Sequence, residues 1–209
     1  MGEAREHQKL LQEAIAREAE AHRLLLAGDT GQAQMALVEA AVIYRRSWEA
    51  SPPRAYGRLV GMLKAATIAG EGPAPARYVR RALGTEGDSP TSWYAIGLAA
   101  LLLDDDALAI TAARAMREEA GGLKAGREPF ERAAEAVSAL AYRNADRYGA
   151  ALAAILADFE QREDHLTGVE IADTALMFER IAAKRGIAAR PDSPLVPGGA
   201  SSAHVPIAP

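Results

Sequence analysis

Four short turns decide the fold, and the first of them reads Gly28-Asp29-Thr30-Gly31-Gln32-Ala33. The other three begin at Gly70, Asp104 and Asn144, so the turns recur at intervals of roughly 35–42 residues, the period of stacked helical hairpins. Each turn separates two stretches with a helical apolar pattern, which predicts an all-α chain of about nine helices. We expect antiparallel hairpins in a right-handed stack that resembles the tetratricopeptide arrangement.

The composition also favours helices. Of the 209 residues 49% are apolar and only 5% are aromatic, and alanine dominates. Small side chains let helices pack closely, while the alternating Val, Ile and Thr runs that are typical of strands are missing. The sequence contains no cysteine. This excludes disulfides and thiolate metal sites and favours a cytoplasmic location.

The pattern of apolar stripes predicts one main domain. We expect residues 1–190 to form a single helical-repeat domain, with a subdivision near residues 84–90, the most loop-like internal segment. Residues 191–209 are rich in proline and glycine, which predicts a disordered tail. The segment Pro194-Leu195-Val196-Pro197 is an alternative, since it could dock as a short extended strap.

Several polar residues predict helix starts. Ser51-Pro52 and Ser89-Pro90 each combine an N-cap serine with a proline that needs no helical donor. Thr167 and Glu170 have the spacing of a capping box for the last helix. In the second helix Tyr44 shares an apolar stripe and is interpreted as a core residue.

A membrane span is not expected. The first helix is studded with charges, unlike a secretory signal. The longest apolar run, from Ala95 to Leu103, has about half the length that spans a bilayer.

Candidate metal and catalytic residues are few. Glu3/His7 and Glu18/His22 are each four residues apart, and two such pairs could ligate a metal ion. Exposed charge pairs with this spacing are far commoner, so we predict no metal site and no cofactor. His165 is interpreted as a cap at a helix C-terminus rather than as a general base. No phosphate-binding loop or nucleophile motif occurs, so we do not expect an enzyme.

The net charge of −4 is small, but its distribution is uneven. Residues 51–90 carry six basic and three acidic side chains, whereas residues 145–209 carry nine acidic and six basic ones. The basic segment is the one hint of nucleic-acid binding, and it is shorter than a DNA-binding stripe, so nucleic acid is not the expected partner. Its members are Arg54, Arg58, Lys64, Arg77, Arg80 and Arg81.

Two family resemblances follow from these residues. Gly28-Asp29, followed by Ala33, Ala36, Ala40 and Tyr44, resembles a tetratricopeptide repeat. Residues 90–197 are similar to the α-helical immunity protein family 49 of bacterial polymorphic toxin systems. The stretches that carry this similarity are Ser92-Trp93-Tyr94-Ala95, Asp104-Asp105, Asp146-Arg147-Tyr148-Gly149-Ala150-Ala151-Leu152, Asp173-Thr174-Ala175-Leu176, Ala182-Ala183-Lys184-Arg185-Gly186-Ile187 and Asp192-Ser193-Pro194-Leu195. The resemblance implies a cytoplasmic antidote that binds and blocks a co-encoded toxin.

The sequence therefore predicts a non-catalytic, protein-binding protein, with an immunity-type inhibitor as the first hypothesis. A tetratricopeptide-like adaptor in a larger complex is the alternative, and a homodimer is left open. We expect the partner to be a protein, such as a basic toxin domain, that binds acidic residues at helix ends. These residues are Asp104, Asp105, Asp106, Glu160, Glu163, Asp164 and Glu170.

Overall fold

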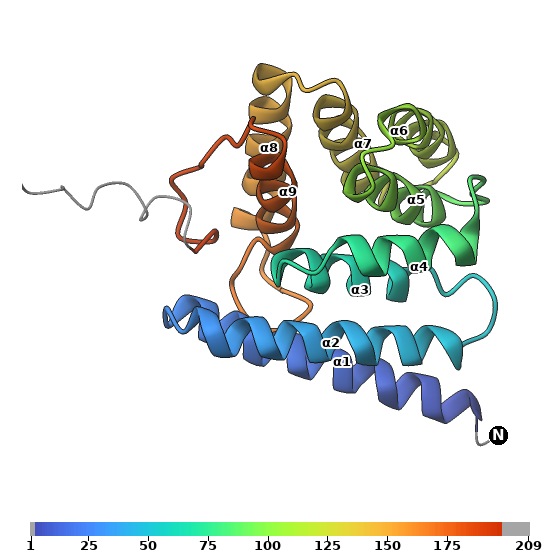
Figure 1. Ribbon diagram of the computed structural model, residues 1–209, viewed down its shortest axis with the longest axis vertical. Coiled ribbons are helices and arrows are strands. Elements are labelled where there is room, and N and C mark those ends of the chain that lie inside the picture. Colours follow the sequence, from blue (N-terminus) through green and yellow to red (C-terminus); the bar gives the residue numbers. More distant parts are fainter. Residues whose placement is uncertain (1–2, 198–209) are drawn as a thin grey trace, which may run out of the picture.

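The computed structural model of the chain describes residues 3–197. This range holds nine helices and no strand, which confirms the all-α prediction (Figure 1). Within it, no helix is both long enough and apolar enough to cross a membrane. The helices are α1 (Glu3–Leu26), α2 (Thr30–Glu49), α3 (Gly57–Ile68), α4 (Pro73–Leu83), α5 (Pro90–Leu102), α6 (Asp106–Gly121), α7 (Glu128–Ala141), α8 (Ala145–Glu160) and α9 (Asp173–Lys184).

Helices that follow one another along the chain pack side by side. α1 and α2 form a long hairpin at one edge of the molecule, and α3 lies against α2 (Figure 1). α5 contacts α3, α4, α6 and α7, and most of its residues are buried. Gly97 faces α6 and α7 closely, since a Cβ there would be in contact with side-chain atoms of Ala112 and Val137 at 3.4 Å. α5 is therefore the centre of the core.

Polar side chains cap the helices that follow most of the predicted turns. The side chains of Asp29, Asp105 and Asn144 each accept a hydrogen bond from the backbone N–H three residues later. Ser89 forms a capping box with Ser92 at the start of α5. These bonds satisfy N–H groups that have no partner inside a helix. Local chemistry thus fixes the starts of α2, α5, α6 and α8.

Two predicted helix starts are wrong. α3 begins at Gly57, because the Ser51 hydroxyl donates to the Trp48 carbonyl at the end of α2 instead of capping α3. α9 begins at Asp173, because Thr167 is hydrogen-bonded to His22 of α1 instead of forming the predicted capping box. In both cases another hydrogen bond competes with the expected cap.

Residues 191–197, which the sequence assigned to the disordered tail, pack against the domain. Residues 194–197 dock there as the alternative suggested, but they form a turn and not an extended strap, since the Val196 N–H donates to the Ser193 carbonyl at 3.0 Å. Val196 is 4% exposed, and the Leu195 carbonyl accepts a hydrogen bond of 2.8 Å from the Ala172 N–H. The Glu179 carboxylate accepts hydrogen bonds from the N–H groups of Ala189 and Arg190, which holds the backbone just before this segment. The rest of the predicted tail, 198–209, lies outside the described residues.

Two aromatic residues test the packing of α8 and α9. Phe178 is fully buried, with its ring centre 6.4 Å from that of Tyr94, whereas Phe159 borders a cavity of about 100 Å³. We expect Phe178→Ala to lower the free energy of unfolding by ~3–5 kcal/mol. Phe159→Ala should cost less, because residues around the cavity can relax into the vacated space. Denaturant titration followed by circular dichroism measures both, and an unchanged midpoint for Phe178→Ala would contradict this packing.

Candidate functional site

Three residues with ionisable side chains are buried on α1. Glu18 and His22, predicted as an exposed pair, are both fully buried. They belong to a stripe that also carries Ala14, Ala21 and Leu25. The prediction of exposure was wrong because a predominantly apolar stripe turns its whole face toward the core, including its polar members. In the other pair His7 is buried, and the side chain of Glu3 lies outside the described part.

An ion pair lies beside Glu18. Lys64 Nζ, from α3, is 2.5 Å from Oδ2 of Asp173, the first residue of α9, and 3.6 Å from Glu18 Oε1. Burial disfavours the charge of each partner, but the opposite charge outweighs burial. The pKa of Lys64 is therefore raised and the pKa of Asp173 is lowered. Both side chains stay ionised and join α3 to α9 inside the protein.

Tyr44 of α2 completes this group. Its hydroxyl donates a hydrogen bond of 2.7 Å to Glu18 Oε2, and burial raises the pKa of Tyr44, which keeps the hydroxyl protonated. Its ring lies directly on α3, where a Cβ at Gly61 would be only 2.8 Å away, so glycine is needed at that position. We call Glu18, His22, Tyr44, Lys64 and Asp173 the buried polar cluster.

Two atoms of the buried polar cluster have no hydrogen-bond partner among the described residues. They are Glu18 Oε1 and His22 Nε2. Burial lowers the pKa of His22 to about 4, so its imidazole is neutral at pH 7. Burial also raises the pKa of Glu18, although Lys64 opposes that shift. Unpartnered buried polar atoms are uncommon in folded proteins and call for an explanation.

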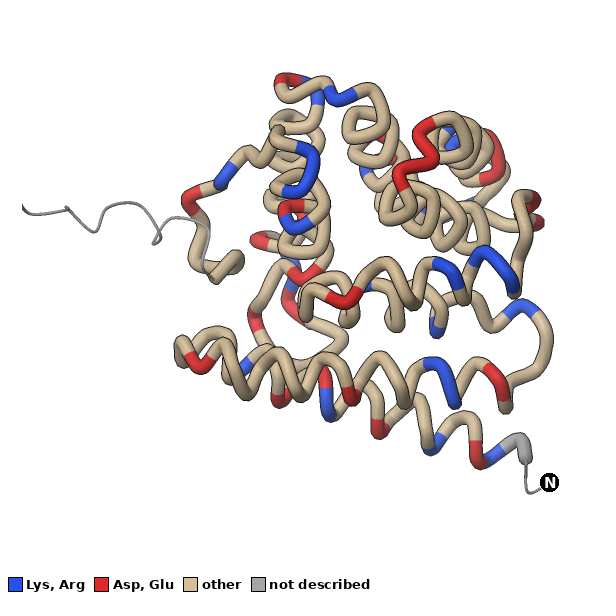
Figure 2. The backbone as a smooth tube through the Cα atoms, viewed as in Figure 1, with Lys and Arg blue, Asp and Glu red and all other residues tan. Residues whose placement is uncertain are grey.

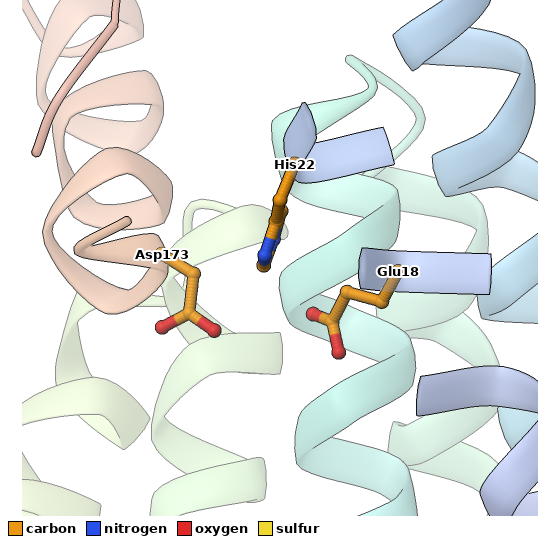
Figure 3. A group of neighbouring side chains, drawn as sticks. All are labelled: Glu18, His22 and Asp173. Carbon is orange, nitrogen blue, oxygen red and sulfur yellow. The ribbon is translucent and has the colours of Figure 1, made fainter. Parts of the chain in front are cut away.

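The same two residues approach Asp173 closely. One potential ligand atom from each of Glu18, His22 and Asp173 lies within 4.8 Å of the others (Figure 3). In the described part of the chain this is the one such group of histidine and carboxylate side chains. Imidazole nitrogen and carboxylate oxygen are ligands for divalent transition metals. The buried polar cluster therefore has the residues for a metal site, which the sequence did not predict.

The segment between α8 and α9 is anchored at the buried polar cluster. We call residues 161–172 the α8–α9 connection; it leaves α8, reaches the α1–α2 hairpin and returns to α9 (Figure 1). Thr167 Oγ1, near its middle, is 3.1 Å from His22 Nδ1, and Asp173 follows its last residue. The connection is thus held at its middle and its end by segments that are distant in the sequence.

The acidic residues predicted to bind a partner fall into two groups that the structure keeps apart. The 104–106 turn lies beside Arg185, which follows α9, whereas the second group surrounds the connection that precedes α9 (Figure 2). α9 has 12 residues, a length of about 18 Å. The two groups therefore do not form one continuous acidic surface. The second group consists of Glu160, Glu163, Asp164 and Glu170, all exposed.

Arg185 engages the 104–106 turn. Its side chain is only 3% exposed. It donates hydrogen bonds of 2.6, 2.8 and 3.2 Å to the Asp106 carboxylate and to the carbonyls of Leu101 and Leu140. Asp105 caps α6 and also pairs with Arg80 at 3.2 Å. These carboxylates therefore have partners within the protein, which leaves them less available to another molecule.

The α8–α9 connection has a different character. Leu166 is 68% exposed. The four carboxylates of the second group make no ion pair within residues 3–197, unlike Asp158 near the end of α8, which pairs with Arg132 and Arg162. His165, predicted as a helix cap, lies beyond the end of α8 with its ring centre 6.0 Å from that of Phe159. An exposed apolar side chain among unpaired carboxylates is a surface that a basic protein could bind.

Sequence reasoning missed three members of the buried polar cluster. From the sequence, Lys64 belongs to the basic segment, Tyr44 to the apolar core, and Asp173 only to a stretch that carries the family resemblance. One signal was present, since Glu18 and Lys64 each interrupt an otherwise apolar helix face. That signal indicates a buried charge, but it does not identify the opposing residue on another helix.

Comparison with protein-family models, curated proteins and solved structures finds no match to this chain. The resemblances to immunity protein family 49 and to tetratricopeptide repeats therefore stay predictions.

The two carboxylates of the buried polar cluster should differ in their effect on stability. Asp173→Asn removes the charge 2.5 Å from Lys64 and leaves a buried ammonium without its closest partner. We expect a loss of ~3–5 kcal/mol in the free energy of unfolding. Glu18→Gln keeps the shape at a position 3.6 Å from Lys64 and should cost less. Urea titrations in a chelating buffer compare the two, and equal losses would contradict the assigned pairing.

Arg185 offers a second comparison. Arg185→Met leaves two buried carbonyls and the Asp106 carboxylate without their donor, so we expect a loss of ~3 kcal/mol or more. Asp104 is 77% exposed and 3.4 Å from Arg185, so Asp104→Asn should cost less than about 1 kcal/mol. Thermal unfolding measures both, and a large effect of Asp104→Asn would show that the turn is held more tightly than its exposure indicates.

Proposed function

We propose that the protein is a non-catalytic protein-binding domain and that the α8–α9 connection is its binding segment. The observation that carries the proposal is the exposed Leu166 among unpaired carboxylates, on a segment anchored at His22 and Asp173. Irregular loops longer than about 12–15 residues are uncommon in compact domains and are usually functional segments or flexible linkers. The connection of residues 161–172 is at the lower end of that range, and its anchoring argues against a flexible linker. Anchoring reduces the conformational entropy lost on binding, which favours affinity.

The chemistry of the connection favours a partner with an apolar pocket surrounded by Lys or Arg. Leu166 supplies an apolar side chain that is already exposed. The surrounding carboxylates supply a negative potential that accelerates encounter with a basic surface and weakens as salt rises. The 104–106 turn makes a smaller contribution in this proposal, because all three of its carboxylates pair with Arg185 or Arg80.

An immunity-type inhibitor of a basic toxin is the function that we favour. The connection falls inside residues 90–197, the range that resembles immunity protein family 49. A bacterial, cytoplasmic location belongs to the same proposal. A toxin gene beside this one, and loss of toxicity when both genes are expressed together, would support it.

A tetratricopeptide-like adaptor is the second candidate, and a different surface favours it. Met35, Val38 and Val42 lie on one face of α2 and are 61%, 37% and 54% exposed. Another subunit of a larger complex could cover this apolar face. Recovery of the protein within a multi-subunit assembly would favour the adaptor over the inhibitor.

Kinetic measurements on a partner recovered by pull-down from the native host test the binding segment. Glu163→Lys combined with Asp164→Lys should slow association about tenfold at low salt, with a smaller effect at high salt. Leu166→Ser should mainly accelerate dissociation. Glu119→Lys is the control, since it reverses an exposed charge on α6. Equal slowing by the control, or unchanged kinetics in all variants, would remove the connection from the binding surface.

A further inference from the structure

We propose that Glu18, His22 and Asp173 bind one divalent transition-metal ion, which fastens the α8–α9 connection to α1. Figure 3 shows the three side chains directed toward a common space, two of them from α1 and the third from the start of α9. Nothing in the proposed protein-binding function requires this ion. The inference rests instead on the geometry, hydrogen bonding and charge of the buried polar cluster.

The spacing of the candidate ligand atoms suits one ion. They lie within 4.8 Å of one another. Ligand atoms bound to one tetrahedral zinc ion at about 2.1 Å lie about 3.4 Å apart. Rotamer adjustments that move each atom by less than about 1 Å would therefore complete the site. A mixed set of one imidazole and two carboxylates favours Zn²⁺ and similar first-row ions over Ca²⁺ or Mg²⁺, which prefer oxygen ligands.

The hydrogen bonds around the cluster have the pattern of an outer shell. Tyr44 holds Glu18 Oε2, Thr167 holds His22 Nδ1 and Lys64 holds Asp173 Oδ2. Each candidate ligand thus has at least one atom fixed by a neighbour, and Asp173 Oδ1 also accepts a hydrogen bond of 3.2 Å from the Thr174 hydroxyl. The other atom of Glu18 and of His22 is buried and has no hydrogen-bond partner in the described part. Outer-shell contacts of this kind orient metal ligands and fix the histidine tautomer.

The charges of the buried polar cluster favour the binding of one more cation. Lys64 is an ammonium group that is paired mainly with Asp173, at 2.5 Å, and is 3.6 Å from Glu18 Oε1. An ionised Glu18 therefore adds a buried negative charge that Lys64 compensates only partly, next to a neutral imidazole lone pair. A metal ion would bind both atoms. A proton on Glu18 would satisfy only the carboxyl group, and it is the rival explanation.

Zinc alone is the probe for this site. Chelator-treated full-length protein is titrated with zinc chloride while heat of binding and thermal unfolding are recorded, and Co²⁺ gives a visible spectrum of the same site. We expect one ion per chain. The midpoint of unfolding should rise by about 5–10 °C when free zinc reaches about a hundredfold excess over its dissociation constant.

Two histidine variants locate the ion. His22→Gln should weaken zinc binding at least about a hundredfold, more than the loss of an outer-shell partner usually costs. His165→Gln is the matched control, because His165 lies in the same region but outside the cluster, and it should bind zinc like the parent. Zinc that stabilises neither the parent nor the control, or that stabilises His22→Gln equally, would overturn the proposal.

Lys64→Met provides a second test that does not depend on the folding of the histidine variants. This substitution removes the positive charge that competes with a metal ion. The variant should be less stable than the parent without metal, and zinc should raise its unfolding midpoint by more than it raises that of the parent. A rise no larger than that of the parent would contradict a metal ion at this position.

Discussion

The buried ion pair between Lys64 and Asp173 is the contact on which the rest of the structure depends. Its partners lie 109 residues apart in the sequence. Removing Lys64 leaves the buried Asp173 carboxylate without its partner, and removing Asp173 leaves Lys64 only the more distant Glu18. Because Asp173 is the first residue of α9, the pair also fixes where the α8–α9 connection ends. The bond between His22 and Thr167 fixes its middle. The exposed position of Leu166 therefore follows from polar contacts inside the core.

The sequence predicted the helices well wherever local chemistry decides their limits. Asp29 and Asp105 cap the helices that follow them because each side chain needs only a backbone N–H three residues away. The predictions failed where a distant partner competes. Thr167 bonds His22 instead of capping α9, and Val196 finds a buried site that keeps residues 191–197 packed. Such competition depends on the packed structure and cannot be read from neighbouring residues alone.

The candidate site was only partly predictable, for a related reason. The exposure of the acidic residues around the α8–α9 connection agrees with their sequence pattern. The pattern did not show that Arg185 would be buried against the 104–106 turn, more than 75 residues away along the chain. Glu18 stands in an apolar stripe, which indicates a buried carboxyl group. That Lys64, Tyr44 and Asp173 surround it depends on how four separate helices meet.

Hydrogen exchange at the Ala172 amide tests the central claim, that the Lys64–Asp173 pair holds the connection in place. This amide donates to the Leu195 carbonyl directly beside Asp173. In Lys64→Met we expect it to exchange at least about tenfold faster than in the parent, while the amides of α6, which is packed away from the cluster, keep their protection. Equal protection of Ala172 in both proteins, or a uniform loss along the whole chain, would contradict the account.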